Sequence, residues 1–414
     1  MAATAPSLRR NFVAGLSGEA LWNFGHSFAA FETILMVYLA RAGAPTPVVG
    51  LLPTVNILGY ALPQILVARR YGGRAQAKRL FVLWNLPTAM ALIAMGGLAH
   101  STGWPAPTWA VAAFLAFLGA SALATGVSSP LWTELSARLF PQQARGRYYG
   151  SVFLVDGVTG MLGYAVAARL LAALPGPTNF ALCMACAGVL TAVAAGAWSF
   201  YGEPRAEERC CQESLRHYAV RLCRLVAADR NFCRFVLIKG FLGLAYMGPA
   251  FIAPYAVKRF GLPDSAAAWA GILLFIPGAL TSLLWGRLGE RRGYLGLSVA
   301  SAFVGLAACL AAAAADSWPL TVPGLLLLGL SYSMNGVATN NIVIESSPST
   351  ERLGYIAAAN VLITLPFGCA PPLGGWLADR FSFRLLFSLS AALYLMGGAL
   401  LAILVRDPRR RQQT

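Results

Sequence analysis

Three ionisable residues, Glu19, His26 and Glu32, lie in one otherwise apolar stretch, 14–39. An ionisable group at the centre of a membrane helix costs roughly 2.5–3.5 kcal/mol on insertion scales, so each is a candidate for function. Glu19 and His26 are seven positions apart and share one stripe of a helix with Asn23. Glu32 lies about 140° around the helix from Glu19 and addresses a different neighbour. The stretch therefore predicts a polar stripe inside a membrane.

Each of these groups has a functional and a structural interpretation. Glu32 and Asp156 could carry a proton; equally, Glu32 could accept a hydrogen bond at the outer boundary, and Asp156 could be tied to Arg145 or Arg147. His26 could titrate near neutral pH or act as a neutral hydrogen-bonding group. The sequence alone leaves these alternatives open.

Two halves of the chain repeat one another in the same order. The string "LGASALATGV" at 118–127 returns as "LGLSYSMNGV" at 328–337, and Asn11–Phe12 returns as Asn231–Phe232. Repeats in parallel order are typical of secondary transporters, in which a site forms between the repeats. The pattern predicts a duplicated membrane-embedded half.

The repeat of Asn11–Phe12 at Asn231–Phe232 has an offset of 220 residues. The same offset places Lys239 at the position of Glu19 and Tyr246 at the position of His26. One hypothesis is that Glu19 and Lys239 face each other and pair when one side of the pathway closes. The alternatives are that each pairs within its own half, or that Glu19 lies at the head-group boundary.

The composition is that of a membrane protein. The chain is 57% hydrophobic and 12% charged, with a mean hydropathy of +0.62, which excludes a water-soluble domain of 414 residues. A span needs about 20 apolar residues, and only helices or closed barrels satisfy the backbone in lipid. We predict an all-α polytopic protein with twelve spans near 14–39, 47–68, 80–99, 108–130, 150–173, 179–201, 234–257, 265–285, 294–314, 320–343, 355–377 and 385–405.

The net charge of +16 does not indicate nucleic-acid binding, because the cations gather on one side of the predicted spans. The opposite face carries only Arg41, Arg169, Lys258, Arg259, Arg380 and Arg384, and Lys239 is intramembrane. This positive-inside bias places both termini in the cytoplasm and attracts anionic lipid head groups. The first span lacks a cleavage site and is expected to be retained, and the composition hints at a bacterial inner (plasma) membrane.

The predicted organisation is a six-helix bundle at 1–201, a cytoplasmic linker with an amphipathic helix at 202–231, and a second six-helix bundle at 232–414. The eight cysteines form no disulfide framework, and those near the linker with His217 match no established zinc spacing. No metal and no cofactor are expected.

One loop motif carries a family resemblance. Between the eighth and ninth spans stands "GRLGERRG", with Gly286, Glu290, Arg291 and Gly293 at the places of a G-x-x-x-D/E-R-x-G loop. With the twelve spans, the duplicated halves and the basic linker, the chain resembles the major facilitator superfamily over nearly its whole length. The resemblance implies two pseudo-two-fold related six-helix bundles and solute transport by alternating access.

The resemblance also implies that the loops act as conformational latches. Glu134 and Glu345 end the fourth and tenth spans and are followed by Arg145 and Arg352, so these are candidate latch pairs. The corresponding loop of the first half, 67–79, keeps glycines and cations but lacks the acidic member.

The tenth span contains the amides Asn335, Asn340 and Asn341, which provide donors and acceptors without charge. Contact with a polar solute and hydrogen bonding between helices explain them equally well.

No G-x-x-x-x-G-K-[ST] loop and no catalytic constellation are found, so we expect no enzyme. The favoured function is a secondary active or facilitative transporter of a small solute, monomeric, with protons as an open second partner. The alternative is a membrane sensor or assembly protein that has lost transport. The cargo and the choice between uptake and efflux do not follow from the sequence.

Overall fold

The computed structural model describes residues 5–71, 77–203, 220, 224, 227–347 and 352–408. The described part is built of helices and contains no strand. By their contacts the residues form two units: unit 1 is Met1–Ala44, Val55–Gln212 and Pro263–Gly271, and unit 2 is Pro45–Thr54, Glu213–Leu262 and Ile272–Thr414. The all-α class predicted from composition is confirmed.

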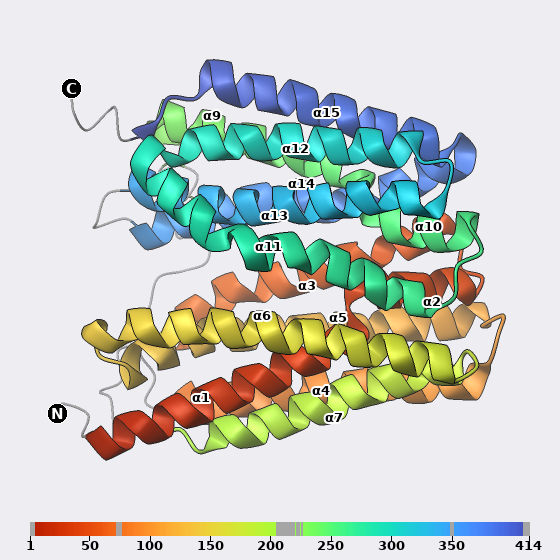
Figure 1. Cartoon of the computed structure of the whole chain (residues 1–414). Helices are drawn as coiled ribbons and strands as arrows, with labels where there is room; N and C mark the ends of the chain where they lie inside the picture. Colours follow the sequence, from red (N-terminus) through yellow and green to blue (C-terminus); the bar gives the residue numbers. More distant parts are fainter. Residues whose placement is uncertain are drawn as a thin grey trace. The chain divides into compact units, whose positions relative to one another are not determined.

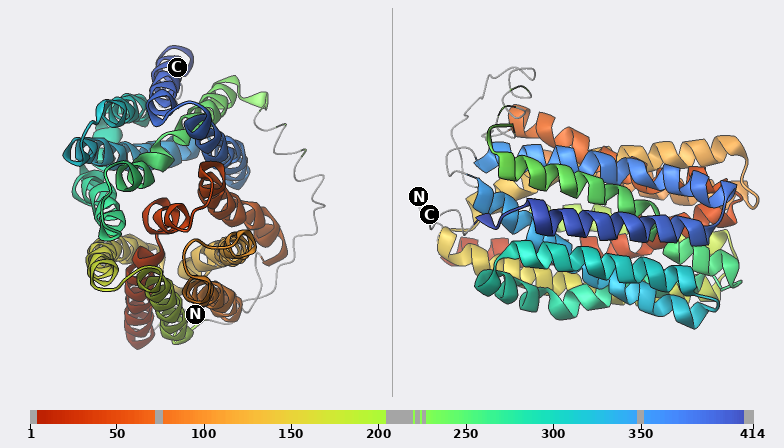
Figure 2. Two further views of the ribbon diagram at one scale, coloured as in Figure 1. Left: turned by 90° about the vertical axis from the view of Figure 1, so that its right-hand side faces the viewer. Right: turned by 90° about the horizontal axis from the view of Figure 1, so that it is seen from above.

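The first half of the chain supplies seven labelled helices (Figure 1), α1 (Ala5–His26), α2 (Met36–Arg41), α3 (Thr46–Tyr71), α4 (Ala77–Thr102), α5 (Thr108–Leu139), α6 (Gln142–Ala173) and α7 (Thr178–Ser199). The second half supplies α9 (Arg230–Leu244), α10 (Ile252–Arg259), α11 (Ser265–Arg292), α12 (Tyr294–Ala314), α13 (Trp318–Ser346), α14 (Arg352–Arg380) and α15 (Phe383–Leu404). Within unit 2, α9, α12, α14 and α15 run side by side (Figure 2, right). The predicted amphipathic linker helix lies outside the described residues.

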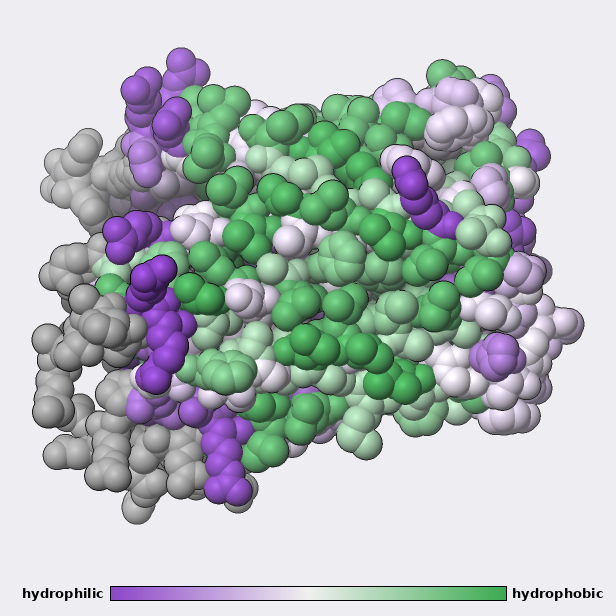
Figure 3. All heavy atoms as spheres, turned by 60° about the horizontal axis from the view of Figure 1, so that its bottom comes forward, coloured by the Kyte–Doolittle hydropathy of each residue, from purple (hydrophilic) through white to green (hydrophobic). Residues whose placement is uncertain are grey.

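Eleven helical stretches among the described residues are long and apolar enough to cross a membrane. The predicted first span is not one of them, because α1 carries Arg9, Arg10 and Glu19 and the helix is interrupted at Ala30, whose ψ of 118° is extended. The face shown in Figure 3 is hydrophobic along its middle and hydrophilic towards both ends. This distribution is the one a multi-pass membrane protein requires.

The interruption of the first helix occurs in both halves of the chain. After α1 come a 3₁₀ turn, Ser27–Ala29, and a π-helical turn, Phe31–Leu35. After α9 come two 3₁₀ turns, Ala245–Met247 and Pro249–Phe251. The breaks lie between His26 and Met36 in the first half and between Leu244 and Ile252 in the second, at offsets of 218 and 216, close to the 220 of the sequence repeat.

The two units depart from the predicted boundaries in two short segments. The start of α3, Pro45–Thr54, belongs to unit 2, where the backbone of Pro371 lies 2.6 Å from where a Cβ of Gly50 would stand. The start of α11, Pro263–Gly271, belongs to unit 1, where Gly271 lies under the ring of Tyr164. Glycine at both places allows the close approach.

Glycines also allow two helices in the core of unit 1 to pack closely. A Cβ on Gly96 would stand 2.6 Å from the carbonyl oxygen of Ala181, and a Cβ on Gly188 would stand 2.6 Å from that of Ala89. Two glycines therefore bring α4 and α7 into backbone contact, which is how membrane helices gain packing energy without a hydrophobic driving force.

Candidate functional site

The polar centre of unit 1 is Glu19 on α1. Its side chain is buried, with 7% of its surface exposed, and Trp132 Nε1 on α5 donates to Glu19 Oε1 over 2.6 Å. Asp156 on α6 is close enough to repel it, and Asn23 on α1 lies beside Asp156. Oδ1 of Asp156 is buried with no hydrogen-bond partner among the described residues. We call Glu19, Asp156, Trp132 and Asn23 the carboxylate cluster.

His26 lies one turn beyond this cluster on the same helix. Its ring stacks on Trp22, with centroids 3.8 Å apart and planes at 28°. Its Nδ1 lies 3.1 Å from the carbonyl oxygen of Trp22, a distance at which Nδ1–H donates. His26 is therefore held by its own helix and does not bond to the carboxylate cluster.

Glu32 occupies the π-helical turn after the break and is only partly buried. Its carboxylate lies close enough to the hydroxyl of Tyr164 on α6 to interact with it electrostatically. Glu32 thus lies near Tyr164, whereas Glu19 contacts Trp132; the break at Ala30 separates the two carboxylates, so the angle expected for one continuous helix does not apply to them.

The polar centre of unit 2 is Lys239 on α9. Only 5% of its surface is exposed, and its Nζ donates to Oδ1 of Asn335 on α13. Thr339 Oγ1 donates to the same oxygen over 3.3 Å. No carboxylate lies within ion-pair distance of Lys239 in the described part of the chain. We call Lys239, Asn335 and Thr339 the ammonium cluster.

The other polar residues predicted on these helices do not join the ammonium cluster. Tyr246 is buried and stacks on Phe367, with centroids 4.0 Å apart. Asn341 donates to the carbonyl oxygen of Val337 in its own helix, and Asn340 is exposed. Of the three predicted amides, Asn335 alone touches a buried charge.

The two clusters occupy equivalent positions in the duplicated halves. Glu19 and Lys239 lie on the first helix of each half, and each bonds to the fourth, α5 or α13. Each side chain thus has a partner inside its own unit, as one alternative from the sequence had it. Pairing between Glu19 and Lys239 stays a prediction.

The predicted latch residue Glu134 bonds to a partner that the sequence did not suggest. Arg138, one turn further along α5, lies 2.8 Å from Glu134 and 3.3 Å from Glu203. Glu203 also accepts from the backbone N–H of Ala77 and Lys78 at the start of α4. The i,i+4 spacing of Glu134 and Arg138 could have revealed the first contact. The side chain of the predicted partner Arg145 lies outside the described part.

The loop that carried the family resemblance ends α11. Gly293 has a φ of +86°, and Oδ2 of Asp407 lies where its Cβ would be, so only glycine fits there. Gly286 stands on the last turns of α11, and Glu290 and Arg291 are exposed. Glu345 lies at the end of α13, and the side chain of its predicted partner Arg352 is outside the described part.

A further contact of unit 1 was missed by sequence analysis. Asp264, just before α11, forms an ion pair of 2.9 Å with Arg41 Nε at the end of α2. Asn179 Nδ2 donates to the other oxygen of Asp264 over 3.0 Å. These residues fix the start of α11 within unit 1.

Comparisons with known proteins agree with this architecture. The family model described as Major Facilitator Superfamily matches residues 235–414. A curated relative, the multidrug resistance protein MdtG of Dickeya zeae (strain Ech586), is 30% identical over 173 residues, which are 36% of this chain and 39% of the relative. The chain therefore matches about two fifths of that relative's length.

Solved structures match over nearly the whole chain. The nucleoside transporter NupG has a TM-score of 0.72 at 11% identity, covering 96% of this chain and 98% of its own. A bacterial homologue of the human lysosomal transporter Spinster, inward-facing and unoccupied, has a TM-score of 0.74 at 14% identity, and the match covers 99% of this chain and 99% of its own. An auto-inhibited POT family peptide transporter has a TM-score of 0.71 at 11% identity, and the match covers 97% of this chain and 97% of its own. At these identities the likeness shows the fold.

The sequence motif, the duplicated helical architecture, the family model over the second half and the whole-chain likeness of fold agree. The second half of the chain matches the Major Facilitator Superfamily model, and the whole chain has the fold of the solved transporters named above.

Proposed function

We propose that the chain is a secondary transporter that moves a small solute by alternating access, with protons coupled at the carboxylate cluster and the solute bound at the ammonium cluster. The observation that carries the proposal is the pair of buried, charged clusters at equivalent places on the two first helices. Buried charges in a membrane protein are costly, and they are expected to mark ion or substrate pathways.

The carboxylate cluster has the chemistry of a proton site. Glu19 and Asp156 repel one another in a buried setting, and no cation pairs with either among the described residues. A proton shared with one of them relieves the repulsion, and the unpartnered oxygen of Asp156 offers a place for it. The hydrogen bond from Trp132 Nε1 keeps the Glu19 carboxyl oriented whether or not the cluster holds a proton.

The ammonium cluster has the chemistry of an anion site. Lys239 has three N–H donors, of which one is satisfied by the neutral amide of Asn335. A buried ammonium is stabilised far more by a charged acceptor than by a neutral one. A solute that carries a carboxylate or phosphate group would therefore bind there in preference to a cationic one.

The relatives' names point to varied cargoes, among them nucleosides and peptides. One fold serves many solutes, so the cargo of this chain must follow from its own residues. The inner-membrane location, the cytoplasmic termini, the monomeric state and the absence of catalysis belong to the same proposal, and the energy comes from solute, proton or voltage gradients.

The test is flux into proteoliposomes containing the purified protein, with a pH gradient imposed and a pH-sensitive dye inside. Anionic, neutral and cationic solutes are compared. We expect an anionic solute to move faster with the gradient than without it, and the dye to report proton movement with the solute.

The variants Glu19→Gln and Asp156→Asn are expected to remove the effect of the pH gradient. Asp379→Asn is the matched control, because Asp379 is exposed on α14. Full gradient-driven flux in both cluster variants would contradict proton coupling, and preference for cationic solutes would contradict the anion site.

A further inference from the structure

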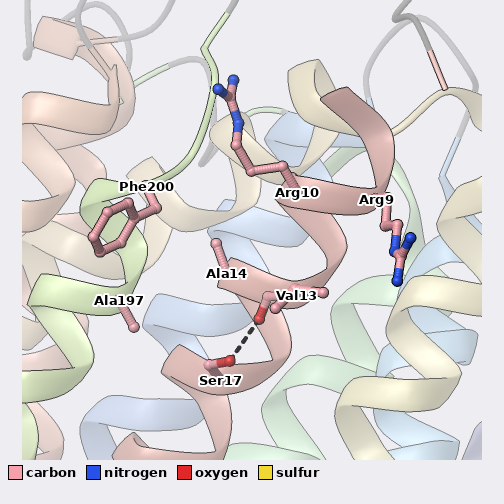
Figure 4. Close-up of a pocket in the computed structure, with 7 residues that line it drawn as sticks. All are labelled: Arg9, Arg10, Val13, Ala14, Ser17, Ala197 and Phe200. Carbon is pink, nitrogen blue, oxygen red and sulfur yellow. Dashed lines mark hydrogen bonds between the residues drawn. The ribbon is translucent and has the colours of Figure 1, made fainter. Parts of the chain in front are cut away.

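A groove runs along the surface of unit 1 where the start of α1 meets the end of α7. It has a volume of about 890 Å³ and is lined by Arg9, Arg10, Val13, Ala14, Ser17, Ala197 and Phe200. Figure 4 shows its two sides, with the residues up to Ser17 coming from α1 and the remaining two from the end of α7. In the figure the guanidinium of Arg10 extends away from the small side chain of Ala14.

A second groove of about 570 Å³ adjoins the first and shares Arg10 and Phe200 with it. It adds Lys78 and Arg79 from the start of α4. The guanidinium of Arg10 lies over Gly202, at the place where a Cβ would stand. Glycine at that place lets Arg10 lie between the two grooves.

The grooves are lined by cations that no carboxylate of the described residues neutralises. Arg9, Arg10 and Arg79 are exposed and pair with no carboxylate among the described residues. Lys78 Nζ donates to two carbonyl oxygens, of Ser199 and Tyr201, at 3.3 and 3.1 Å.

The one carboxylate among the described lining residues, Glu203, is already bound to Arg138 and to two backbone N–H groups of α4. Among the described residues the grooves therefore present cations that no carboxylate pairs with, and these cations can accept an anionic ligand.

The same grooves have an apolar side. Val13 is 60% exposed and Phe200 is 70% exposed, and Ala14 and Ala197 lie between them in the lining. A cationic end next to an exposed apolar trough matches a molecule with an anionic head and a hydrocarbon tail. A free anion would use the cations and leave the trough empty.

We propose that these grooves form a binding site for an anionic glycerophospholipid of the surrounding membrane. The phosphate lies against Arg10, Lys78 and Arg79, with Arg9 at the edge, and an acyl chain lies along Val13 and Phe200. The predicted topology puts the site in the cytoplasmic leaflet, where basic residues attract anionic lipid. The site is separate from the carboxylate cluster and does not depend on the cargo.

The test is native mass spectrometry of the full chain released from nanodiscs of phosphatidylglycerol and phosphatidylcholine. We expect the protein to retain phosphatidylglycerol, and Arg9→Gln/Arg10→Gln to weaken its binding roughly thirtyfold, since each cation near a lipid surface contributes to attraction. Phe200→Ser is expected to reduce retention of the two-chain lipid as well. Lys258→Gln/Arg259→Gln is the matched control, because it removes two exposed cations elsewhere.

A second measurement needs no variant. Thermal unfolding of the unmodified protein is compared after addition of phosphatidylglycerol, phosphatidylcholine or inorganic phosphate, and only the first is expected to raise the unfolding temperature. Equal stabilisation by inorganic phosphate would overturn the lipid in favour of a free anion. Unchanged retention in the Arg9/Arg10 variant, or equal loss in the control, would overturn the site.

Discussion

The contact of Lys239 with Asn335 gives the sharpest test of the ammonium cluster. In Asn335→Leu, the buried ammonium loses the acceptor that the structure provides, and Thr339 loses the acceptor of its hydroxyl. A hydrogen bond to a charged group contributes roughly 1.5–3 kcal/mol. We expect a loss of about 2 kcal/mol, which is roughly a thirtyfold change in the folding equilibrium.

The measurement is the free energy of unfolding from equilibrium denaturation in mixed micelles. Asn340→Leu is the matched control on the same helix, because Asn340 is exposed. A surface substitution of this kind is expected to change stability by less than about 0.5 kcal/mol.

The double variant Lys239→Met/Asn335→Leu separates this explanation from simple loss of packing. Replacing both partners by apolar groups of similar size can be nearly neutral, because no buried charge is left without an acceptor. We therefore expect the double variant to be more stable than Asn335→Leu alone. If its loss equals the sum of the two single losses, the two side chains are not coupled and the argument fails.

Three further predictions follow from other parts of the molecule. In Glu19→Gln, Lys239→Gln and the double variant, losses of solute flux are expected to be non-additive, and strict additivity would rule out coupling across the duplication. Gly188→Leu is expected to lower the free energy of unfolding, measured by denaturation, by about 1–3 kcal/mol, because the new side chain separates α4 from α7. Gly196→Leu on the same helix is the control and should be tolerated, because open space surrounds Gly196. Asp264→Asn is expected to cost about 1 kcal/mol of unfolding free energy, because its ion pair at the end of α2 is partly exposed, and an unchanged stability would show that the pair is dispensable.

Much of the fold followed from the sequence because apolar length decides where helices cross a membrane. The predicted span 294–314 coincides with α12, and 385–405 differs from α15 by one or two residues. The interruption at Ala30 was not predicted, since nothing in local composition marks the extended residue. The repeat offset did place Lys239 at the structural equivalent of Glu19.

The partners of the site residues were harder to predict than the residues themselves. Lys239 and Asn335 were both singled out, but they are distant in sequence and periodicity within one helix says nothing about which helix faces which. Glu203 and Asp264 were missed because they lie at helix ends, where no apolar pattern surrounds them. Ion pairs at such places depend on the tertiary fold.

The repeated interruption of the first helix in each half has a consequence for how the protein can change over evolution. Where regular hydrogen bonding stops, near Ala30 and near Gly248, the rotational register of one helical segment is no longer passed on to the next. Residues beyond the break can therefore drift without turning Glu19 or Lys239 away from their partners. The segments on the two sides of each break are therefore free to diversify separately during evolution.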